Sequence, residues 1–310
     1  MLTDRLYIDG LDAFTNFGLL ILAGGYNELL SYPPLKPVAY NDWQEEDGIE
    51  PDLSSPKLDT KTFSIRFGLS GTQYRLGTLL ELLSDGAYHS FHFKEISQAR
   101  NLRLVGHTDN DLAVSIGFIT LTLADDYPLA GYTYTAPTTT LPTQYDYKID
   151  DLWLSQYGIR ATQGTLAEIL RAGEVKLNLL RNISTQAGAE YDGNTVVFRE
   201  KQARLFLHMT AETLTQLWRN YNALLYNLTQ PDMRQLYIDD TGQTLPCFYH
   251  SSTVTAFYPT GKIWLDFTLT LTFTAFRLGE EEFILATEND QAVTTEEAIE
   301  PNAINLSHYD

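Results

Sequence analysis

The sequence has little cysteine, little positive charge and no long hydrophobic run. Its single cysteine, Cys247, cannot form a disulfide within the chain, which fits folding in a reducing compartment such as the cytoplasm. Only 21 Lys and Arg residues stand against 40 Asp and Glu residues, so the formal charge is −19. Proteins that bind DNA or RNA neutralise phosphates with Lys and Arg, so this excess of acid argues against direct nucleic-acid binding.

The N-terminal region lacks the features of a targeting segment. Asp4, Asp9 and Asp12 stand where a signal peptide carries basic residues, and the uncharged residues 13–27 are interrupted by glycine and too few to span a bilayer. We therefore expect a soluble chain that no cleaved signal exports and that has no membrane partner. A hydrophobic content of 44% is ordinary for a folded protein, and 310 residues are enough for two domains.

Motifs that carry chemistry are also missing. The sequence has no G-x-S-x-G, no phosphate-binding glycine loop and no H-E-x-x-H. Acidic pairs such as Asp9 with Asp12 are typical of solvated loops in so acidic a chain, and His89 and His92 are expected on opposite faces of a strand. Residues 107–111 lack the Gly and Glu of a calcium loop and predict a turn.

Two further candidate groups lie in apolar strand patterns. His208 is expected to be a core or interface histidine, and Cys247 a buried strand cysteine rather than a nucleophile activated by His250. We therefore expect no enzyme activity, no catalytic residue, no metal site and no cofactor.

Two changes of composition divide the chain. Residues 127–147 contain three prolines and lose all periodicity, and residues 278–310 hold nine carboxylates with no Lys or Arg. These changes predict a first domain over residues 1–126, a linker over 127–147, a second domain over 148–277 and an acidic tail over 278–310. The tail is interpreted as a solvated terminus, with docking onto a partner as the alternative.

The two halves look like divergent copies of one unit. Tyr7–Leu11 leads to Gly18, as Lys148–Leu152 leads to Gly158. Each half then has a β-patterned segment, "KTFSIRFGL" in residues 61–69 and "QARLFLHM" in residues 202–209, followed by a helix, a hairpin-like region and a long strand. The helices are expected over residues 73–84 and 211–228, the second one capped by Thr210.

The closing strands give the strongest β signals. Residues 267–274 alternate apolar side chains with threonine, which predicts a strand with one buried face. In the first half the alternation changes phase between Phe118 and Ile119, which predicts a β-bulge there.

One long loop is a candidate contact surface. Residues 31–60 are polar and rich in proline, with seven acids and only Lys36 and Lys57 as countercharges. Trp43 is expected to be exposed in this loop, as an interface contact or as a local anchor. The candidate inter-subunit contacts are Trp43, Glu45, Glu46 and Asp47.

The combination of these features resembles the distal tail (Dit-like) and related baseplate proteins of tailed phages, which have the tail-tube fold. The resemblance rests on "YIDGLDAFTNFGLLI" in residues 7–21, the loop ending in "EEDGIEPDLSS" in residues 45–55, the strand "KTFSIRFGL" and the helix after it. In the second half, "AEYDGNTVVFREKQARLFLHM" in residues 189–209 occupies the matching place before its helix. The resemblance implies a β-rich α+β fold of two tandem tail-tube-like β-sandwich or barrel domains, each with one flanking α-helix.

The same resemblance implies a structural virion protein, assembled in the host cytoplasm, that forms a ring at the distal end of the tail tube. The ring connects the tube to the baseplate or tail tip, and its partners are copies of itself, the tail tube protein and hub or fibre proteins. DNA passes through its lumen without specific binding. One unit per chain implies a hexamer, which is slightly favoured, whereas two units per chain also allow a hub-like trimer with pseudo-sixfold symmetry. The alternatives from other classes are a carbohydrate-binding β-protein with exposed aromatic side chains and a hydrolase with an acidic pair.

Overall fold

The structure is a computed structural model that describes residues 3–70, 75–110, 112–113, 115–176, 180–191 and 196–276. Residues up to Phe276 form one compact unit. The acidic tail predicted over residues 278–310 lies outside the described residues.

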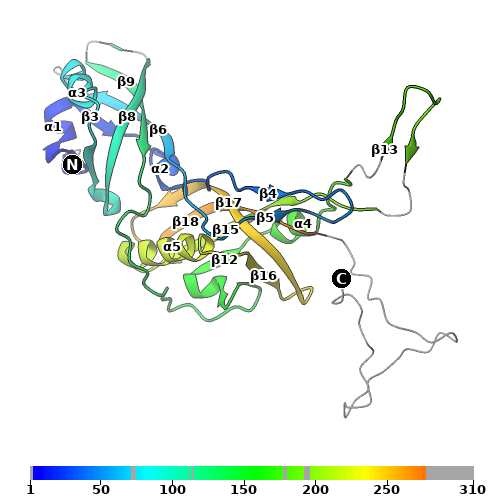
Figure 1. The fold of residues 1–310 in the computed structure, drawn as a ribbon. Coiled ribbons are helices and arrows are strands. Elements are labelled where there is room, and N and C mark those ends of the chain that lie inside the picture. Colours follow the sequence, from blue (N-terminus) through cyan, green and yellow to red (C-terminus); the bar gives the residue numbers. More distant parts are fainter. Residues whose placement is uncertain are drawn as a thin grey trace. The chain divides into compact units, whose positions relative to one another are not determined.

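The fold is β-rich α+β, as predicted, and its main elements are two seven-stranded antiparallel sheets with the same strand order (Figure 1). In copy 1, defined as residues 6–125, the order is β2-β1-β7-β8-β9-β6-β3. Its strands are β1 (Leu6–Ile8), β2 (Leu11–Asp12), β3 (Leu19–Ile21), β6 (Lys61–Ser70), β7 (His89–Phe93), β8 (Gln98–Asn110) and β9 (Ile116–Asp125).

Copy 2, defined as residues 147–276, repeats this order as β11-β10-β16-β17-β18-β15-β12. Its strands are β10 (Tyr147–Ile149), β11 (Leu152–Trp153), β12 (Ile159–Ala161), β15 (Lys201–Ala211), β16 (Arg234–Ile238), β17 (Gln243–Tyr258) and β18 (Ile263–Phe273). Each copy also has a two-stranded hairpin, formed by β4 (Tyr40–Asn41) with β5 (Glu50–Pro51) and by β13 (Leu180–Arg181) with β14 (Glu190–Tyr191). The internal duplication inferred from sequence is therefore present strand by strand.

The alternation of the long strands places one face of each sheet in the core. In β18, Phe267, Leu269 and Leu271 are at most 2% exposed, and the threonines between them point to the other face. In β6, Ile65 and Phe67 are fully buried in the same way. The expected one-sided strand is thus confirmed up to Leu271, whereas Thr272 and Thr274 are also buried, so the end of the strand is covered on both faces.

Helices are few and short apart from two that flank the sheets. They are α1 (Ala13–Phe17), α2 (Asn27–Leu30), α3 (Leu76–Leu83), α4 (Thr165–Leu170), α5 (Leu214–Leu228) and the 3-10 turns η1 (Lys94–Ile96) and η2 (Leu154–Tyr157). The predicted cap of α5 at Thr210 was wrong: Thr213 caps it and accepts a hydrogen bond from Gln216 N at 3.1 Å. Thr210 instead continues β15 opposite Trp264, so strand pairing takes precedence over an earlier helix start.

The bulge predicted between Phe118 and Ile119 was also wrong. The pairing of β9 with β6 runs without interruption through these residues, and the irregularity lies in β8 between Leu104 and Gly106. Phe118 lies on the outer face of β9, where the Arg66 guanidinium stacks on its ring, 4.6 Å from the centroid. The apolar alternation in the sequence therefore changes phase because Phe118 is an apolar residue on the outer face, and the strand itself is regular.

The segment between the sheets, residues 126–146, contains no strand or helix. It is held on α5 by Asn220, whose side chain accepts from Thr138 N at 2.9 Å and donates to Thr138 O at 2.8 Å. Arg219 adds a hydrogen bond to Ala136 O at 2.7 Å. The proline- and threonine-rich segment thus begins with turns at residues 128–131 and is anchored on α5.

Candidate functional site

The hairpin β4–β5 of copy 1, called arm 1 and defined as residues 40–51, is fixed on copy 2 by one lysine. The Lys176 ammonium lies 2.6 Å from Asp42 Oδ1 and donates to the carbonyls of Trp43 and Glu46, both at 2.9 Å, and of Gly48. Lys176 is only 5% exposed, so its charge is compensated almost entirely by oxygens of arm 1.

The tip of arm 1 also pairs with the backbone of copy 2. Phe198 N donates to Asp47 Oδ1 at 2.7 Å, and Phe198 O accepts from Gly48 N at 2.7 Å. Ile49 N donates to Thr274 O at 2.8 Å. Gly48 has φ +70°, and a Cβ there would lie 1.5 Å from Thr274 O, so both the backbone conformation and the close approach require glycine.

A second contact between the copies is aromatic. Tyr32 stacks on Tyr221 of α5 with ring centroids 4.0 Å apart, and each hydroxyl donates to a backbone carbonyl of the opposite copy. Tyr32 N donates to Ser252 Oγ at 2.7 Å, and Tyr249 OH donates to Pro33 O at 2.8 Å. Burial raises the pKa of both Tyr32 and Tyr221 well above the usual tyrosine value.

This second contact lies along one edge of β17. Leu35 N donates to His250 O at 3.4 Å, Val254 N donates to Ser31 Oγ at 2.9 Å, and Asn27 Nδ2 donates to Thr255 O at 2.9 Å. Residues 27–35 of copy 1 therefore cover the part of β17 that β16 leaves unpaired. Trp218 of α5 adds a hydrogen bond from its ring nitrogen to Ile96 O at 2.7 Å.

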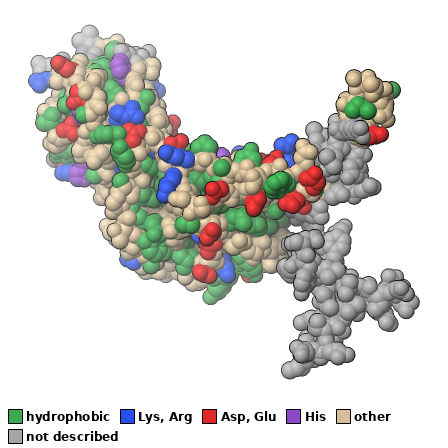
Figure 2. Space-filling model, in the orientation of Figure 1, with side chains coloured by type: hydrophobic (Ala, Val, Ile, Leu, Met, Phe, Trp, Pro, Cys, Tyr) green, Lys and Arg blue, Asp and Glu red, His purple; other side chains and the backbone are tan. Residues whose placement is uncertain are grey.

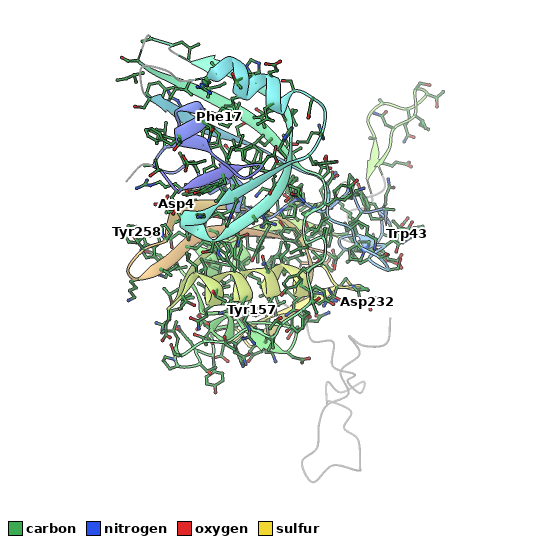
Figure 3. All side chains as sticks on the ribbon, turned by 90° about the vertical axis from the view of Figure 1, so that its left-hand side faces the viewer. Asp4, Phe17, Trp43, Tyr157, Asp232 and Tyr258 are labelled. Carbon is green, nitrogen blue, oxygen red and sulfur yellow. The ribbon has the colours of Figure 1, made fainter. Side chains whose placement is uncertain are left out.

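The structure places the four predicted contact residues in arm 1. Trp43 and Glu46 contribute backbone carbonyls to Lys176, and Asp47 contributes its carboxylate to Phe198 N. The Trp43 side chain is 53% exposed, as expected (Figure 3). Glu45 is also exposed. Their contact with a neighbouring subunit remains a prediction; within one chain, Trp43, Glu46 and Asp47 contact the second copy.

Charge is concentrated on the same arm. Asp42, Glu45, Glu46 and Glu50 are exposed, and Figure 2 shows acidic side chains along the surface where β4 and β5 lie. The Trp43 ring nitrogen is 3.5 Å from Glu50 Oε2. Arm 1 is thus an acidic hairpin that encloses a single buried cation.

The acidic and histidine candidates have structural roles. Asp9 accepts from Ser90 N at 2.8 Å and lies 2.7 Å from His89 Nδ1, while Asp12 caps α1. His89 is buried and His92 is exposed, which confirms their placement on opposite faces of β7. Among the described residues, no group of three or more His, Cys, Asp or Glu side chains is arranged to hold a metal ion.

The remaining candidates are strand residues. Residues 107–110 belong to β8, so the predicted turn there was wrong, because pairing with β9 continues to Asn110. Cys247 is fully buried in β17, as expected, and burial raises the pKa of its thiol to about 12, which removes it as a nucleophile. His208 is half-buried, with Nδ1 2.5 Å from Asp266 Oδ1 on the neighbouring strand.

Sequence reasoning missed Lys176 and Tyr32, each of which makes several contacts between the copies. An alignment of the two halves with a constant offset of 140 residues pairs Lys36 with Lys176 and Lys61 with Lys201. The structure agrees, because Lys36 N donates to Lys57 O and Lys176 N donates to Val197 O. That alignment signal was available, but it does not show which of the two lysines is covered.

No protein-family model matches the chain, and no curated protein matches it. Among solved structures, the chain is similar to the Dit protein of phage SPP1, described as a paradigm of the hub adsorption apparatus in phages that infect Gram-positive bacteria. The two are 12% identical, the match covers 87% of this chain and 98% of that chain, and the TM-score is 0.31. Scores this low do not allow residues of the two proteins to be equated. No helix among the described residues is long and apolar enough to cross a membrane.

Proposed function

We propose that this chain is a structural, non-enzymatic protein of a phage tail. It joins further copies of itself in a closed ring at the distal end of the tail tube and connects the tube to the baseplate or tail tip. Its partners are the tail tube protein on one side and hub or fibre proteins on the other. The observation that carries the proposal is the duplicated sheet unit, in which arm 1 of the first copy docks on the second copy. The sequence resemblance to distal tail proteins supports it.

The contact between the copies bears on how many chains form the proposed ring. Copy 1 and copy 2 have the same topology and pack through one copy's hairpin and the other's sheet edge, a heterologous contact that can be repeated. If six such units surround the channel, as the resemblance implies, three chains supply them. We therefore propose the three-chain ring with pseudo-sixfold symmetry, and a ring of six chains is the competing outcome.

The negative charge fits passage of DNA through such a ring. The body of the chain, without residues 278–310, has 31 acids and 21 bases, and acidic surfaces do not retain a polyanion. The ring lumen is therefore proposed to let DNA pass without specific binding, and the protein is proposed to be located in the virion.

Mass in solution tests the proposal. The purified chain is measured by light scattering and native mass spectrometry over a range of concentrations, and particles are imaged in negative stain. Closed rings of about 105 kDa, three times the 35.1 kDa chain, are expected, and rings twice as heavy would support six chains. A strict monomer, both alone and with the tail tube protein, contradicts the proposal, and quenching of its tryptophan fluorescence by sugars would favour the carbohydrate-binding alternative.

A further inference from the structure

The hairpin of copy 2 has the same geometry as arm 1. Arm 2, defined as residues 180–191, pairs Leu180 with Tyr191, and each of its residues lies 140 positions after its equivalent in arm 1 (40 to 180, 51 to 191). Gly188 has φ +86°, close to the +70° of Gly48. No heavy atom of the described residues lies within 4 Å of a Cβ built on Gly188, whereas the Gly48 position is filled by Thr274. Arm 2 thus has a glycine where the docked arm 1 has Gly48, but no described surface lies against it.

Copy 1 has the matching acceptor backbone. In copy 2, Phe198 forms an isolated β-bridge with Val175, and its backbone N–H and C=O both bond to arm 1. In copy 1, Leu58 forms the equivalent β-bridge with Leu35. Among the described residues, Leu58 N–H and C=O have no hydrogen-bond partner. A surface hollow of about 380 Å³ lies beside them, lined by Leu58, Asp126 and Pro128 among others. Asp126 follows β9 as Thr274 follows β18, so the hollow is the equivalent of the place that arm 1 occupies on copy 2.

Lys36 completes the comparison. Lys36 N donates to Lys57 O and Lys176 N donates to Val197 O, both at 2.8 Å, so the two lysines leave the backbone at equivalent positions. Lys176 is buried under arm 1, but Lys36 is exposed and its ammonium has no partner among the described side chains and carbonyls. An identical lysine is thus retained at the position where an arm is missing.

We propose that arm 2 of one chain docks on copy 1 of a second chain, over Lys36, Leu58 and the hollow beside Asp126. This deepens the proposed function, on which it rests for the closed ring, by naming the surfaces through which chains join. The contact is head-to-tail, since each chain offers arm 2 and receives an arm on copy 1, and such a contact closes into a ring when its rotation allows.

The chemistry of the second contact differs from the first. Arm 1 carries five carboxylates, but at the positions of Asp42 and Asp47 arm 2 has Asn182 and Ala187. Arm 2 therefore binds Lys36 through backbone carbonyls alone, without the ion pair and without the side-chain acceptor for Leu58 N–H. The contact between chains is weaker than the one within the chain, and its loss with rising salt is less steep.

Disulfide trapping tests the contact directly. In the chain, Asp47 lies against Phe198, so the equivalent pair across chains is Ala187 with Leu58. The double variant Ala187→Cys/Leu58→Cys is oxidised at the concentrations at which the chain assembles, and Cys247 does not interfere because it is fully buried. Covalent dimers and trimers are expected on non-reducing gels, whereas Ala187→Cys alone, Leu58→Cys alone and Ala187→Cys paired with Gly77→Cys on α3 give none.

A second variant removes the contact. Lys36→Met is expected to raise the concentration needed for half-assembly at least tenfold, and the matched exposed Lys262→Met leaves it unchanged. Rings that form without crosslinking and tolerate Lys36→Met overturn the docking but not the proposed function. A chain that stays monomeric and uncrosslinked overturns both, and a disulfide closed within one chain shows that arm 2 folds onto its own copy 1 and also overturns the docking.

Discussion

Single residues with identical chemistry have opposite fates in the two copies. Lys36 and Lys176 share a backbone position, yet one is exposed and the other is buried under four oxygens. Lys61 and Lys201 behave alike instead: each begins a central strand and donates to two carbonyls at the end of a short helix, at Leu29 and Ser31 or at Ile169 and Arg171. A lysine is therefore buried here wherever a turn or an arm brings carbonyl oxygens around it.

Removing the Lys176 ammonium is expected to destabilise the chain. Lys176→Met leaves Asp42 and three carbonyls of arm 1 without their donor, which lowers the free energy of unfolding by about 2–4 kcal/mol in urea titrations. Lys36→Met, measured under monomeric conditions, is the matched control and is expected to change the free energy of unfolding by less than about 0.5 kcal/mol. Equal effects of the two variants would contradict the role given to Lys176.

The buried lysines predict a pH dependence. Burial lowers the pKa of Lys61 to about 7 and that of Lys201 to about 8, both from about 10.5 in the unfolded chain. Above pH 7 the unfolded chain thus binds protons that the folded chain has lost, so stability rises with pH. Denaturation at pH 7 to 9 should show this rise, which is at most about 1.4 kcal/mol per pH unit for each lysine. This range lies below the pKa of tyrosine in the unfolded chain and near that of cysteine. Lys61→Met reduces the slope, and the exposed Lys57→Met does not.

Strands and helices were predicted correctly from sequence where their pattern is local and does not depend on how far neighbouring strands pair. The apolar alternation of β18 and the apolar face of α5 are local and were predicted. The helix start at Thr213 and the bulge in β8 depend on how far β15 and β9 remain paired, which residues distant in sequence decide. Propensity alone thus placed the helix cap three residues too early and the bulge on β9 instead of β8.

Arm 1 is the element whose position depends on one glycine. Gly48→Ala places a methyl group against Thr274 O in a left-handed backbone, so the tip is expected to leave copy 2. Hydrogen exchange of the Ile49 amide should then accelerate at least tenfold, and proteases should cut within residues 42–47. Gly188→Ala is the matched control, because it has the same backbone strain with open space around it. An unchanged exchange rate at Ile49 in Gly48→Ala would count against the docked tip.

On the scale of the whole molecule, the two copies are coupled by their buried contact. The Tyr32 ring, 5% exposed, lies between Tyr221, Tyr249 and Phe267 of copy 2. Because residues of copy 1 complete the core of copy 2, the chain is expected to unfold in one transition rather than two.

Calorimetry tests this coupling. Tyr32→Ala creates a cavity and removes the hydrogen bond from the Tyr32 hydroxyl to Tyr221 O, so stability is expected to fall by about 3–5 kcal/mol and the single heat-absorption peak to split into two. Tyr145→Ala, at a site 62% exposed, should cost at most about 1 kcal/mol and keep one peak. Two peaks in the unmodified protein would show that the copies unfold independently.

The sequence by itself determined the features that depend on near neighbours in the chain. These are the duplication, the buried face of each long strand, the buried Cys247 and the exposed, acidic loop around Trp43. The candidate residues in that loop could be found in this way, because exposure and charge follow from local composition.

Only the tertiary structure decided which surfaces of the two copies meet. Lys36 and Lys176 stand in equivalent places, and nothing near them in sequence separates them. What separates them is that arm 1 lies over Lys176, and this depends on Gly48, Phe198 and Thr274, which come together only when both sheets have folded. Burial of a charge is set by the groups that surround it in space, so the same lysine is a solvated side chain in one copy and the anchor of a docked arm in the other.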